Sequence, residues 1–223
     1  MRLKEFTGAE TRSTGNIVAG VPSDLPLRCR CGHVRGVASE VAPSGGLRLV
    51  CYCKDCQAFA RFLERPDVLD PAGGTDIFHM PAGRMKLTAG ADALRCLSVS
   101  GKVFRWYTDC CRTPIANTAG ASFPVVGLIH SFISSEIDDH SRNEVLGPPL
   151  CRIFEHSSIG PLPPDAAPPV SFRVFIRRIT KIFGWWLRGL GRPNPFFDDL
   201  TKAPRSMPRV LTPTERAAEN GVT

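Results

Sequence analysis

Short apolar or alternating segments dominate the first two thirds of the chain, and glycine, proline and aspartate interrupt them. Runs of this kind cover residues 47–50, 94–99 and 103–107. Runs of this length with such breakers are typical of β-strands. Ser100-Gly101-Lys102 joins the second run to the third and favours a hairpin turn. The pattern predicts a mainly β fold of short antiparallel sheets.

Residues 57–66 are the one stretch of this region with helical composition, and they begin directly after Cys56. The N-terminus of a helix carries partial positive charge, which lowers the pKa of a nearby thiol. We therefore expect Cys56 to lie beside a helix N-terminus. A short helix that merely caps the sheet gives the same pattern, and the two roles are compatible.

A second pattern lies near the C-terminus, where apolar residues recur every three or four positions. One helical face carries Phe172, Phe175, Ile176, Ile179, Ile182, Phe183, Trp186, Leu187 and Leu190. The other carries Arg173, Arg177, Lys181 and Arg188. Ser171 is a suitable N-cap, and the glycines and proline after Arg188 end the helix. We expect a basic amphipathic helix over 171–192, too often interrupted by charge for the ~20 apolar residues of a membrane span.

Three roles are open for this helix. Its apolar face can close an open side of the β domain or pair with a second copy in a homodimer, which are usual fates of an amphipathic helix. The basic face and the Trp185-Trp186 pair also fit a membrane surface. Nucleic acid is the least favoured partner, because the charges lie opposite a bulky apolar stripe that phosphate contacts would leave unburied.

Charge divides the chain unevenly. Residues 1–170 hold 18 Lys and Arg against 17 Asp and Glu, whereas residues 171–223 hold 10 against 4, so most of the net charge of +7 is C-terminal. The segment before the helix is rich in proline, which favours an extended linker. We expect an N-terminal arm at 1–26, a zinc-binding β domain at 27–159, a linker at 160–170, the helix at 171–192 and an irregular tail at 193–223.

Three groups contain seven of the nine cysteines: Cys29 with Cys31, then Cys51, Cys53 and Cys56, and finally Cys110 with Cys111. Thiolates one or two residues apart converge on a soft metal ion, and sulfur-rich tetrahedral sites select Zn²⁺ or iron–sulfur centres. Disulfides fit poorly, because the cysteine count is odd and no secretory signal opens the chain. We therefore expect a metal-binding, cytoplasmic protein. Cys151, alone among apolar residues, is expected to be a buried small side chain.

The groups stand in the order found in one known family. Cys29-Arg30-Cys31-Gly32, Cys51-Tyr52-Cys53-Lys54-Asp55-Cys56 and Cys111-Arg112-Thr113-Pro114-Ile115 resemble the three motifs of the glutathione-dependent formaldehyde-activating enzyme and centromere protein V family. The resemblance covers about residues 27–135 and implies a β-tent domain with two zinc ions. It implies a closed structural site at Cys29, Cys31 and Cys111, and an open catalytic site at Cys51, Cys53 and Cys56.

The reaction that this resemblance implies is the addition of formaldehyde to the glutathione thiol and its release, which is carbon–sulfur lyase chemistry. A zinc ion with three protein thiolates keeps a free position, which such a reaction needs. Lys54 and Arg61 lie close by in sequence and could receive a carboxylate of the tripeptide, although surface charges of this kind are more often solvated. The alternative is a non-enzymatic zinc module whose helix docks a partner protein or a membrane surface.

The chain departs from the family pattern at the last motif, where Thr108 replaces the first cysteine and Arg112 replaces glycine. Neighbouring residues of an extended strand point in opposite directions, so Cys110 and Cys111 can share an ion only across a tight turn. The candidates for the fourth structural ligand are, in order of preference, Cys110, then Cys96 and His33 well behind it.

Departures also surround the open site. Tyr52 replaces a histidine that is frequent in the family, and the ordinary pKa of tyrosine, about 10, makes it a poor base. Asp55 and Gln57 stand where basic residues are common, which predicts weaker anion recognition beside Cys56. The histidines form no HxxxH or HExxH pattern, and the sequence does not place His79 relative to the metal.

Overall fold

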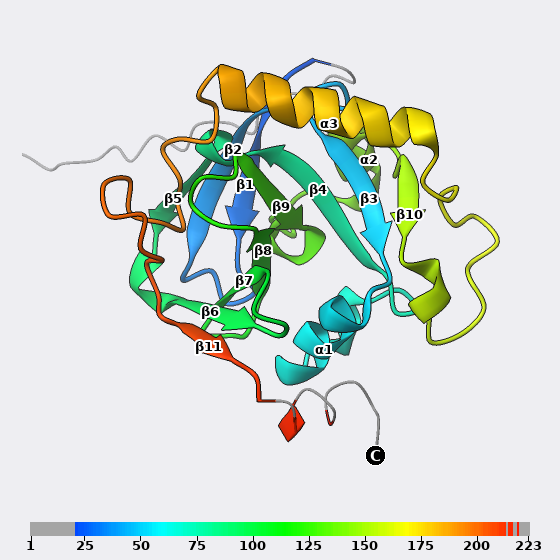
Figure 1. Ribbon diagram of the computed structural model, residues 1–223, viewed down its shortest axis with the longest axis horizontal. Coiled ribbons are helices and arrows are strands. Elements are labelled where there is room, and N and C mark those ends of the chain that lie inside the picture. Colours follow the sequence, from blue (N-terminus) through cyan, green and yellow to red (C-terminus); the bar gives the residue numbers. More distant parts are fainter. Residues whose placement is uncertain (1–20, 213, 216–217, 219–223) are drawn as a thin grey trace, which may run out of the picture.

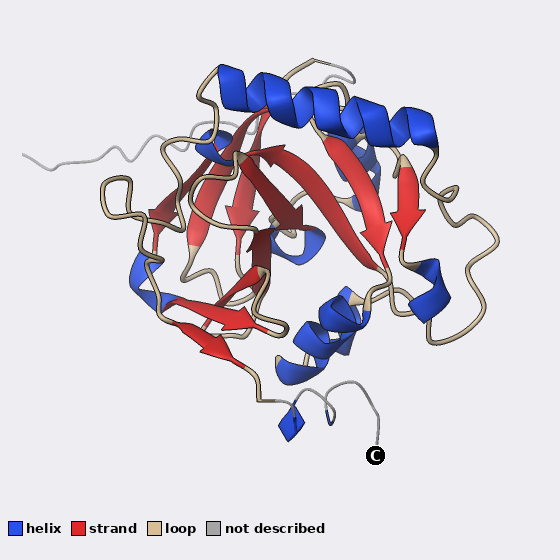
Figure 2. Ribbon diagram, viewed as in Figure 1, coloured by secondary structure: helices blue, strands red, loops and turns tan. Residues whose placement is uncertain are grey.

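Two β-sheets form in the part of the chain that the structure describes, residues 21–212, 214–215 and 218 of a computed structural model (Figure 1 and Figure 2). The smaller sheet has the order β1 (Ser23–Arg28), β2 (Arg35–Val41), β5 (Met85–Ala89). The larger has the order β10 (Cys151–Ile153), β3 (Leu47–Cys51), β4 (Thr75–Pro81), β9 (Val125–Ile129), β8 (Pro114–Thr118), β7 (Phe104–Thr108), β6 (Leu94–Ser98), β11 (Pro208–Val210).

The helices are α1 (Lys54–Phe62), α2 (Asp139–Leu146) and α3 (Phe172–Leu187). Single 3₁₀ turns occupy Pro66–Val68, Ala82–Arg84, Ala91–Ala93, His130–Phe132 and Glu155–Ser157. The predicted mainly β fold with a C-terminal helix is therefore confirmed.

Antiparallel pairing prevails, as expected for short strands, but both edges of the larger sheet are parallel. β10 pairs with β3, and β11 pairs with β6, in the parallel sense. The expected hairpin joins β6 to β7, and Gly101 in its turn adopts a positive φ of 76°. The register places Cys96 opposite Trp106. Both side chains point into the core between the sheets.

That core takes side chains from both sheets that are at most 2 % exposed, among them Leu25, Ala38, Phe78, Trp106 and Leu128. Helices α1 and α3 pack on the opposite face of the larger sheet. α1 packs there through Phe59 and Leu63, and α3, at the top of Figure 1, packs through Val174. Cys51 and Cys56 belong to the cluster that Val174 contacts. The second cysteine group therefore lies where this face meets the start of α1.

The short helix after the second cysteine group forms, with earlier bounds than the sequence suggested. α1 begins at Lys54 rather than at residue 57 and ends at Phe62. Cys53 is its N-cap residue, and Cys56 lies in its first turn, where the backbone N–H of Cys56 donates to the carbonyl of Cys53 at 3.0 Å. The expected position of Cys56 at a helix N-terminus is confirmed.

The ends of the β domain differ from the expected boundaries. β1 begins at Ser23, inside the expected N-terminal arm, of which residues 1–20 lie outside the described part. The segment expected as an irregular tail contributes Phe196 and Phe197 to the core. Trp106 stacks on Phe196 with ring centroids 4.9 Å apart and meets the edge of Phe197 at 5.6 Å. Two consecutive aromatics give no periodic signal, so the sequence pattern could not reveal this contact.

The amphipathic helix is confirmed, and its orientation is informative. The hydroxyl of Ser171 accepts the N–H of Val174 at 3.3 Å, and Gly189 at a φ of 66° follows the last turn. Trp185 is 5 % exposed against the domain, whereas most of the large apolar side chains face solvent. Of the roles left open for this helix, closure of the β domain by the apolar face does not occur in this structure. Among the described residues, none of the helices has the length and apolar content to cross a membrane.

Replacing Phe196 by alanine should lower the free energy of unfolding by about 3–5 kcal/mol, because the change removes a fully buried ring that stacks on Trp106. Chemical denaturation of the full chain measures this. Leu200→Ala is the matched control, since Leu200 is 92 % exposed only a few residues away, and it should leave stability within about 0.5 kcal/mol. Equal stabilities for the two variants would contradict the packing of the C-terminal segment.

Candidate metal centres

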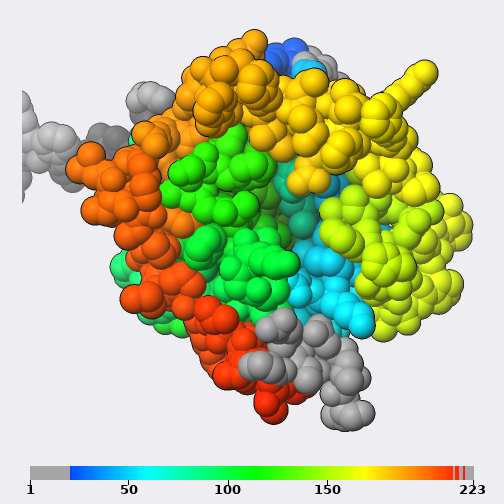
Figure 3. Space-filling view, in the orientation of Figure 1, coloured from blue at the N-terminus to red at the C-terminus, as the bar shows by residue number. Residues whose placement is uncertain are grey.

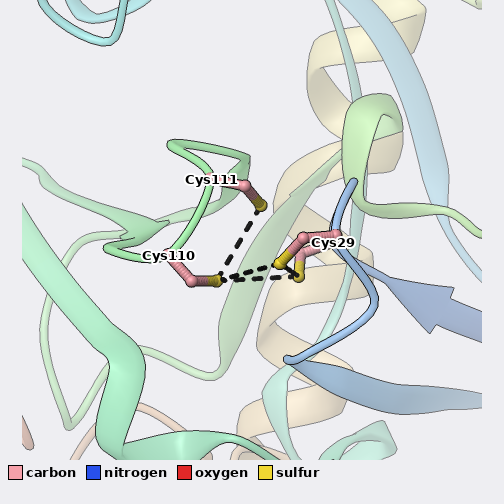
Figure 4. A group of neighbouring side chains, drawn as sticks. Cys29, Cys110 and Cys111 are labelled. Atoms are coloured by element: carbon pink, nitrogen blue, oxygen red, sulfur yellow. Dashed lines mark hydrogen bonds between the residues drawn. The ribbon is translucent and has the colours of Figure 1, made fainter.

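The first and third cysteine groups meet in space. The sulfurs of Cys29, Cys31, Cys110 and Cys111 all lie within 4.8 Å of one another. Cys31 and Cys110 are closest at 3.4 Å, Cys29 lies 3.6 Å from Cys31, and Cys110 lies 3.9 Å from both Cys29 and Cys111. Figure 4 shows Cys29, Cys110 and Cys111 converging from two separate loops. All four thiols are free, so no disulfide accounts for the approach.

These distances fit a tetrahedral metal ion. An ion bound about 2.3 Å from each sulfur needs sulfurs about 3.8 Å apart. Four of the six separations, at 3.4 to 3.9 Å, bracket that value, and all six are within 4.8 Å. Cys96 and His33, the lower-ranked candidates for the fourth ligand, are not part of the group. The expectation that Cys110 supplies it agrees with the geometry.

The loop after β1 shapes the first half of this centre. Gly32 has a positive φ of 78°, which reverses the chain directly after the two cysteines. Its N–H donates to the carbonyl of Cys29 at 2.8 Å. The backbone N–H of Val34 donates to the sulfur of Cys29 at 3.2 Å, so the turn aims a hydrogen-bond donor at this ligand.

The loop between β7 and β8 shapes the second half, and it explains how adjacent cysteines face one ion. The N–H of Thr108 donates to the carbonyl of Thr113 at 3.0 Å, and the N–H of Arg112 donates to the carbonyl of Thr108 at 2.9 Å. Arg112 adopts the left-handed conformation, with φ 53°, that glycine would favour. The chain therefore forms a tight turn here without the cysteine and glycine that the motif resemblance led us to expect.

Thr108 also contacts a thiol of this turn. Its hydroxyl lies 3.4 Å from the sulfur of Cys111, and the hydroxyl of Thr113 lies 3.2 Å from the same atom. Burial alone would raise the pKa of Cys111, but these hydroxyls lower it to about 5. Cys111 is thus prepared as a thiolate, which is the form that binds metal.

The second cysteine group forms a separate centre. Cys51 ends β3, and Cys53 and Cys56 belong to the start of α1. Their sulfurs lie within 4.8 Å of one another, with Cys51 and Cys56 3.8 Å apart. No fourth Cys, His, Asp or Glu from the described ranges joins them. The centre has three protein ligands where the first has four, and a tetrahedral ion here would keep one position open.

The environment of this centre favours negative charge on Cys53. Hydrogen bonds from the thiols of Cys51 and Cys56 lower the pKa of Cys53 to about 2, and the charge of Arg105 contributes. The hydrogen bond to Cys53 in turn raises the pKa of Cys51. The position of Cys53 at the N-terminus of α1 acts in the same direction.

Arg105 is the residue of this site that the sequence interpretation missed. It lies on β7, it is 3 % exposed, and its Nη2 is 3.7 Å from a carboxylate oxygen of Asp55. That separation is too long for a hydrogen bond. Its Nε and Nη1 have no hydrogen-bond partner within the described part of the chain. A buried guanidinium with two unused donors is costly unless an acceptor reaches it.

Asn117 lies next to Arg105. The two residues pair directly across β7 and β8, so their side chains share one face of the sheet. The Oδ1 atom of Asn117 is also buried without a partner among the described residues. The next residues in register on this face are Gly127 on β9, which has no side chain, and His79 on β4. Figure 3 shows this side of the molecule hollowed below α3.

Other predicted residues of the open site have structural roles. The hydroxyl of Tyr52 donates to Asp70 at 2.8 Å, and burial together with Asp70 raises the pKa of Tyr52 to about 12. Gln57 donates to the carbonyls of Tyr52 and Ser157. Lys54 is exposed. Neither Tyr52 nor Gln57 is therefore free to act on a ligand.

His79 lies apart from the three thiols. Thr75, rather than His79, pairs with Cys51. Burial, aided by the charge of Arg178, lowers the pKa of His79 to about 3. The imidazole is consequently neutral near pH 7 and can accept a proton only weakly.

The purified protein should contain about two metal ions per chain, because its thiols form two separate clusters. Elemental mass spectrometry measures this metal content. Cys53→Ser should remove one ion and leave the fold, whereas Cys31→Ser should unfold the domain, since a closed centre contributes folding free energy. Cys96→Ala is the control and should keep both ions. Full metal content in the Cys53→Ser and Cys31→Ser variants would show that these thiols are not ligands.

Comparison with curated proteins finds no match. A model of a family of unknown function, DUF6151, matches residues 22–204. The matched region contains both cysteine centres, Arg105 and α3. The chain therefore belongs to the DUF6151 family.

Proposed function

We propose that this chain is a zinc protein whose three-thiolate centre performs carbon–sulfur chemistry on a small thiol adduct. The observation that carries the proposal is the contrast between the two centres, four thiols in one and three in the other. A closed centre serves the fold, and an open one admits a ligand. The resemblance of the three cysteine motifs to the formaldehyde-activating family supports the choice of reaction.

Zinc fits both donor sets. Thiolate ligands in tetrahedral arrangement suit zinc, and structural zinc takes four of them. The nine free thiols fit a reducing compartment such as the cytoplasm. When bound by three thiolates, zinc supplies a Lewis-acidic position and favours the thiolate form of an incoming thiol.

The proposed reaction is the reversible joining of a thiol and formaldehyde. The thiol sulfur forms a bond to the carbonyl carbon, the carbonyl electron pair moves to oxygen, and that oxygen takes up the proton that the thiol gives up. Release breaks the same carbon–sulfur bond. Cys51, Cys53 and Cys56 hold the ion, while α1 places Cys53 and Cys56 at its positive end.

Arg105 and Asn117 indicate the class of thiol. The unused N–H groups of Arg105 call for an acceptor, and a carboxylate is the acceptor that a guanidinium binds best. The unused oxygen of Asn117 calls for a donor such as a peptide N–H. A thiol with a carboxylate and an amide beside it, as in glutathione, meets both requirements. Asp55 is the acidic group that such a ligand would displace from Arg105.

Glutathione and formaldehyde are in equilibrium with their hydroxymethyl adduct. The zinc-loaded chain should accelerate this exchange by at least about tenfold. Exchange spectroscopy by NMR at equilibrium measures the rate. Cys53→Ser should abolish the acceleration and Cys96→Ala should retain it, because only Cys53 belongs to the open centre. Equal rates for wild type and Cys53→Ser would end the enzyme proposal and leave a non-enzymatic zinc module.

The role of Arg105 can be tested with two thiols that differ only in a carboxylate, N-acetylcysteine and N-acetylcysteamine. Calorimetry on the zinc-loaded chain should give at least about tenfold tighter binding of N-acetylcysteine, because its carboxylate gains charge-assisted hydrogen bonds. Arg105→Met should bring the two affinities within about twofold, and Arg105→Lys should restore part of the preference.

Arg95→Met is the matched control for that experiment. Arg95 lies on the neighbouring strand of the same hairpin, but its side chain is 43 % exposed and pairs with Asp109, so its loss should leave the preference unchanged. If the wild-type chain binds both thiols equally, Arg105 only balances the charge of the thiolates. If it binds neither thiol, the centre does not accept this class of ligand.

A further inference from the structure

The outward face of α3 is a large apolar surface. Seven of its side chains are 42 to 77 % exposed: Phe172, Phe175, Ile176, Ile179, Phe183, Trp186 and Leu187. Phe183 and Trp186 stack on each other with ring centroids 6.0 Å apart. Large apolar side chains are usually buried inside a domain, and a contiguous apolar patch on the surface marks an interaction site.

The opposite side of the helix holds it to the domain. Val174 packs on the cluster that contains Cys51, and Trp185 is 5 % exposed. Lys181 donates to the backbone oxygen of Ser44, and its ammonium lies 6.0 Å from the ring of Trp185. α3 is thus fixed along its length, as its position across the top of Figure 1 indicates. Only the outward half of the helix can meet a partner.

This attachment favours a flat partner. A protein groove that binds an amphipathic helix encloses much of its circumference. Because one side of α3 is already packed on the domain, a planar surface suits the accessible half better. An amphipathic helix lying in the plane of a bilayer buries only its apolar face, by about 5–10 Å.

Charge indicates the sign of that surface. Residues 171–192 contain six basic side chains and no acidic one: Arg173, Arg177, Arg178, Lys181, Arg188 and Arg192. Arg173, Arg177 and Arg188 are exposed along one flank of the apolar face. Two copies of α3 meeting face to face would bring these like charges together, which opposes a homodimer through this helix. A negatively charged surface is attracted by the same residues.

A groove lined partly by polar residues lies next to Trp186, at the end of α3. It has a volume of about 380 Å³ and lies between the end of α3 and the loop before β9, with Ser122, Gly191 and Arg192 among its lining residues. Phe123 of that loop is 38 % exposed. The loop and the helix end therefore present apolar and basic groups together.

We propose that α3 docks the protein flat on a membrane surface that carries anionic lipids. The apolar residues enter the boundary between headgroups and acyl chains, and the flanking arginines remain at the level of the phosphates. Docking this way adds a location to the proposed zinc chemistry and does not depend on it.

Sedimentation with vesicles tests the proposal on the full, metal-loaded chain. Vesicles of phosphatidylcholine with about 30 % phosphatidylserine should bind the protein at a lipid concentration at least about tenfold below that needed with phosphatidylcholine alone. Binding should weaken in about 0.5 M NaCl, because salt screens the basic residues. Equal binding to both kinds of vesicle, or binding to neither, would overturn the proposal.

Variants locate the contact. The double variant Phe183→Ser with Trp186→Ser should reduce binding to anionic vesicles by at least about tenfold, since both side chains lie on the outward face. The control, Leu200→Ser with Met207→Ser, removes two side chains that are 92 % and 87 % exposed elsewhere, and it should bind like the wild type. Equal loss in both double variants would contradict docking through α3.

Fluorescence and light scattering complete the test. Of the three tryptophans, Trp106 and Trp185 are buried and Trp186 is 60 % exposed, so a blue shift on vesicle binding should come from Trp186 and disappear in Trp186→Phe. Light scattering measures the mass of the protein in solution. If the wild type is a dimer and the Phe183→Ser with Trp186→Ser variant is a monomer, a second copy of the chain covers this face instead of a membrane.

Discussion

The structure depends on bringing thiols from distant segments of the chain to shared points. Cys29 and Cys31 follow the first strand of the smaller sheet, and Cys110 and Cys111 lie in a turn of the larger sheet. Their sulfurs come as close as 3.4 Å. An ion at this point would tie the two sheets together at their ends, in addition to the core between them. Such a tie contributes folding free energy directly, because the unfolded chain cannot provide the same ligand set.

The second centre is built on the other face of the larger sheet and has different surroundings. A strand end and the first turn of α1 supply its three thiols. Arg105 and Asn117 line the same face with buried polar atoms that lack partners in the described part of the chain. α3 packs through Val174 on the cluster that contains Leu49 and Cys151, and it turns its apolar face outward. The proposed reaction centre lies at the start of α1 and the proposed membrane contact lies on α3, and Figure 1 shows these two helices at opposite ends of the view.

Much of this arrangement could be predicted from local sequence patterns. The spacing of the cysteines indicated the local thiol groups, and the resemblance of their motifs to a known family implied that the first and the last group meet. The period of the apolar residues identified α3 together with its N-cap, Ser171. Patterns of this kind describe which residues share a face, but they do not say which face meets the domain. In α3 that choice depends on Trp185 and Lys181, whose contacts involve distant residues such as Ser44. The inward packing of Phe196 and Phe197 likewise depends on the position of Trp106.

Two features of the site needed the structure for a different reason. Backbone hydrogen bonds and a left-handed Arg112 hold the turn from Thr108 to Thr113, so Cys110 and Cys111 reach one centre without the cysteine and glycine that the motif resemblance led us to expect. Arg105 is one basic residue in an aromatic strand, and only its burial beside Asp55 and the thiols distinguishes it. The sequence signal that could have revealed Arg105 is an arginine at a strand position where an apolar core residue is expected.

X-ray absorption at the zinc edge of the protein as purified tests the central claim most directly. The account predicts a first shell dominated by sulfur at about 2.3 Å, with between three and four sulfurs per ion. A shell dominated by nitrogen or oxygen at about 2.0 Å would contradict it, because the thiols that meet in this structure would then not be the ligands.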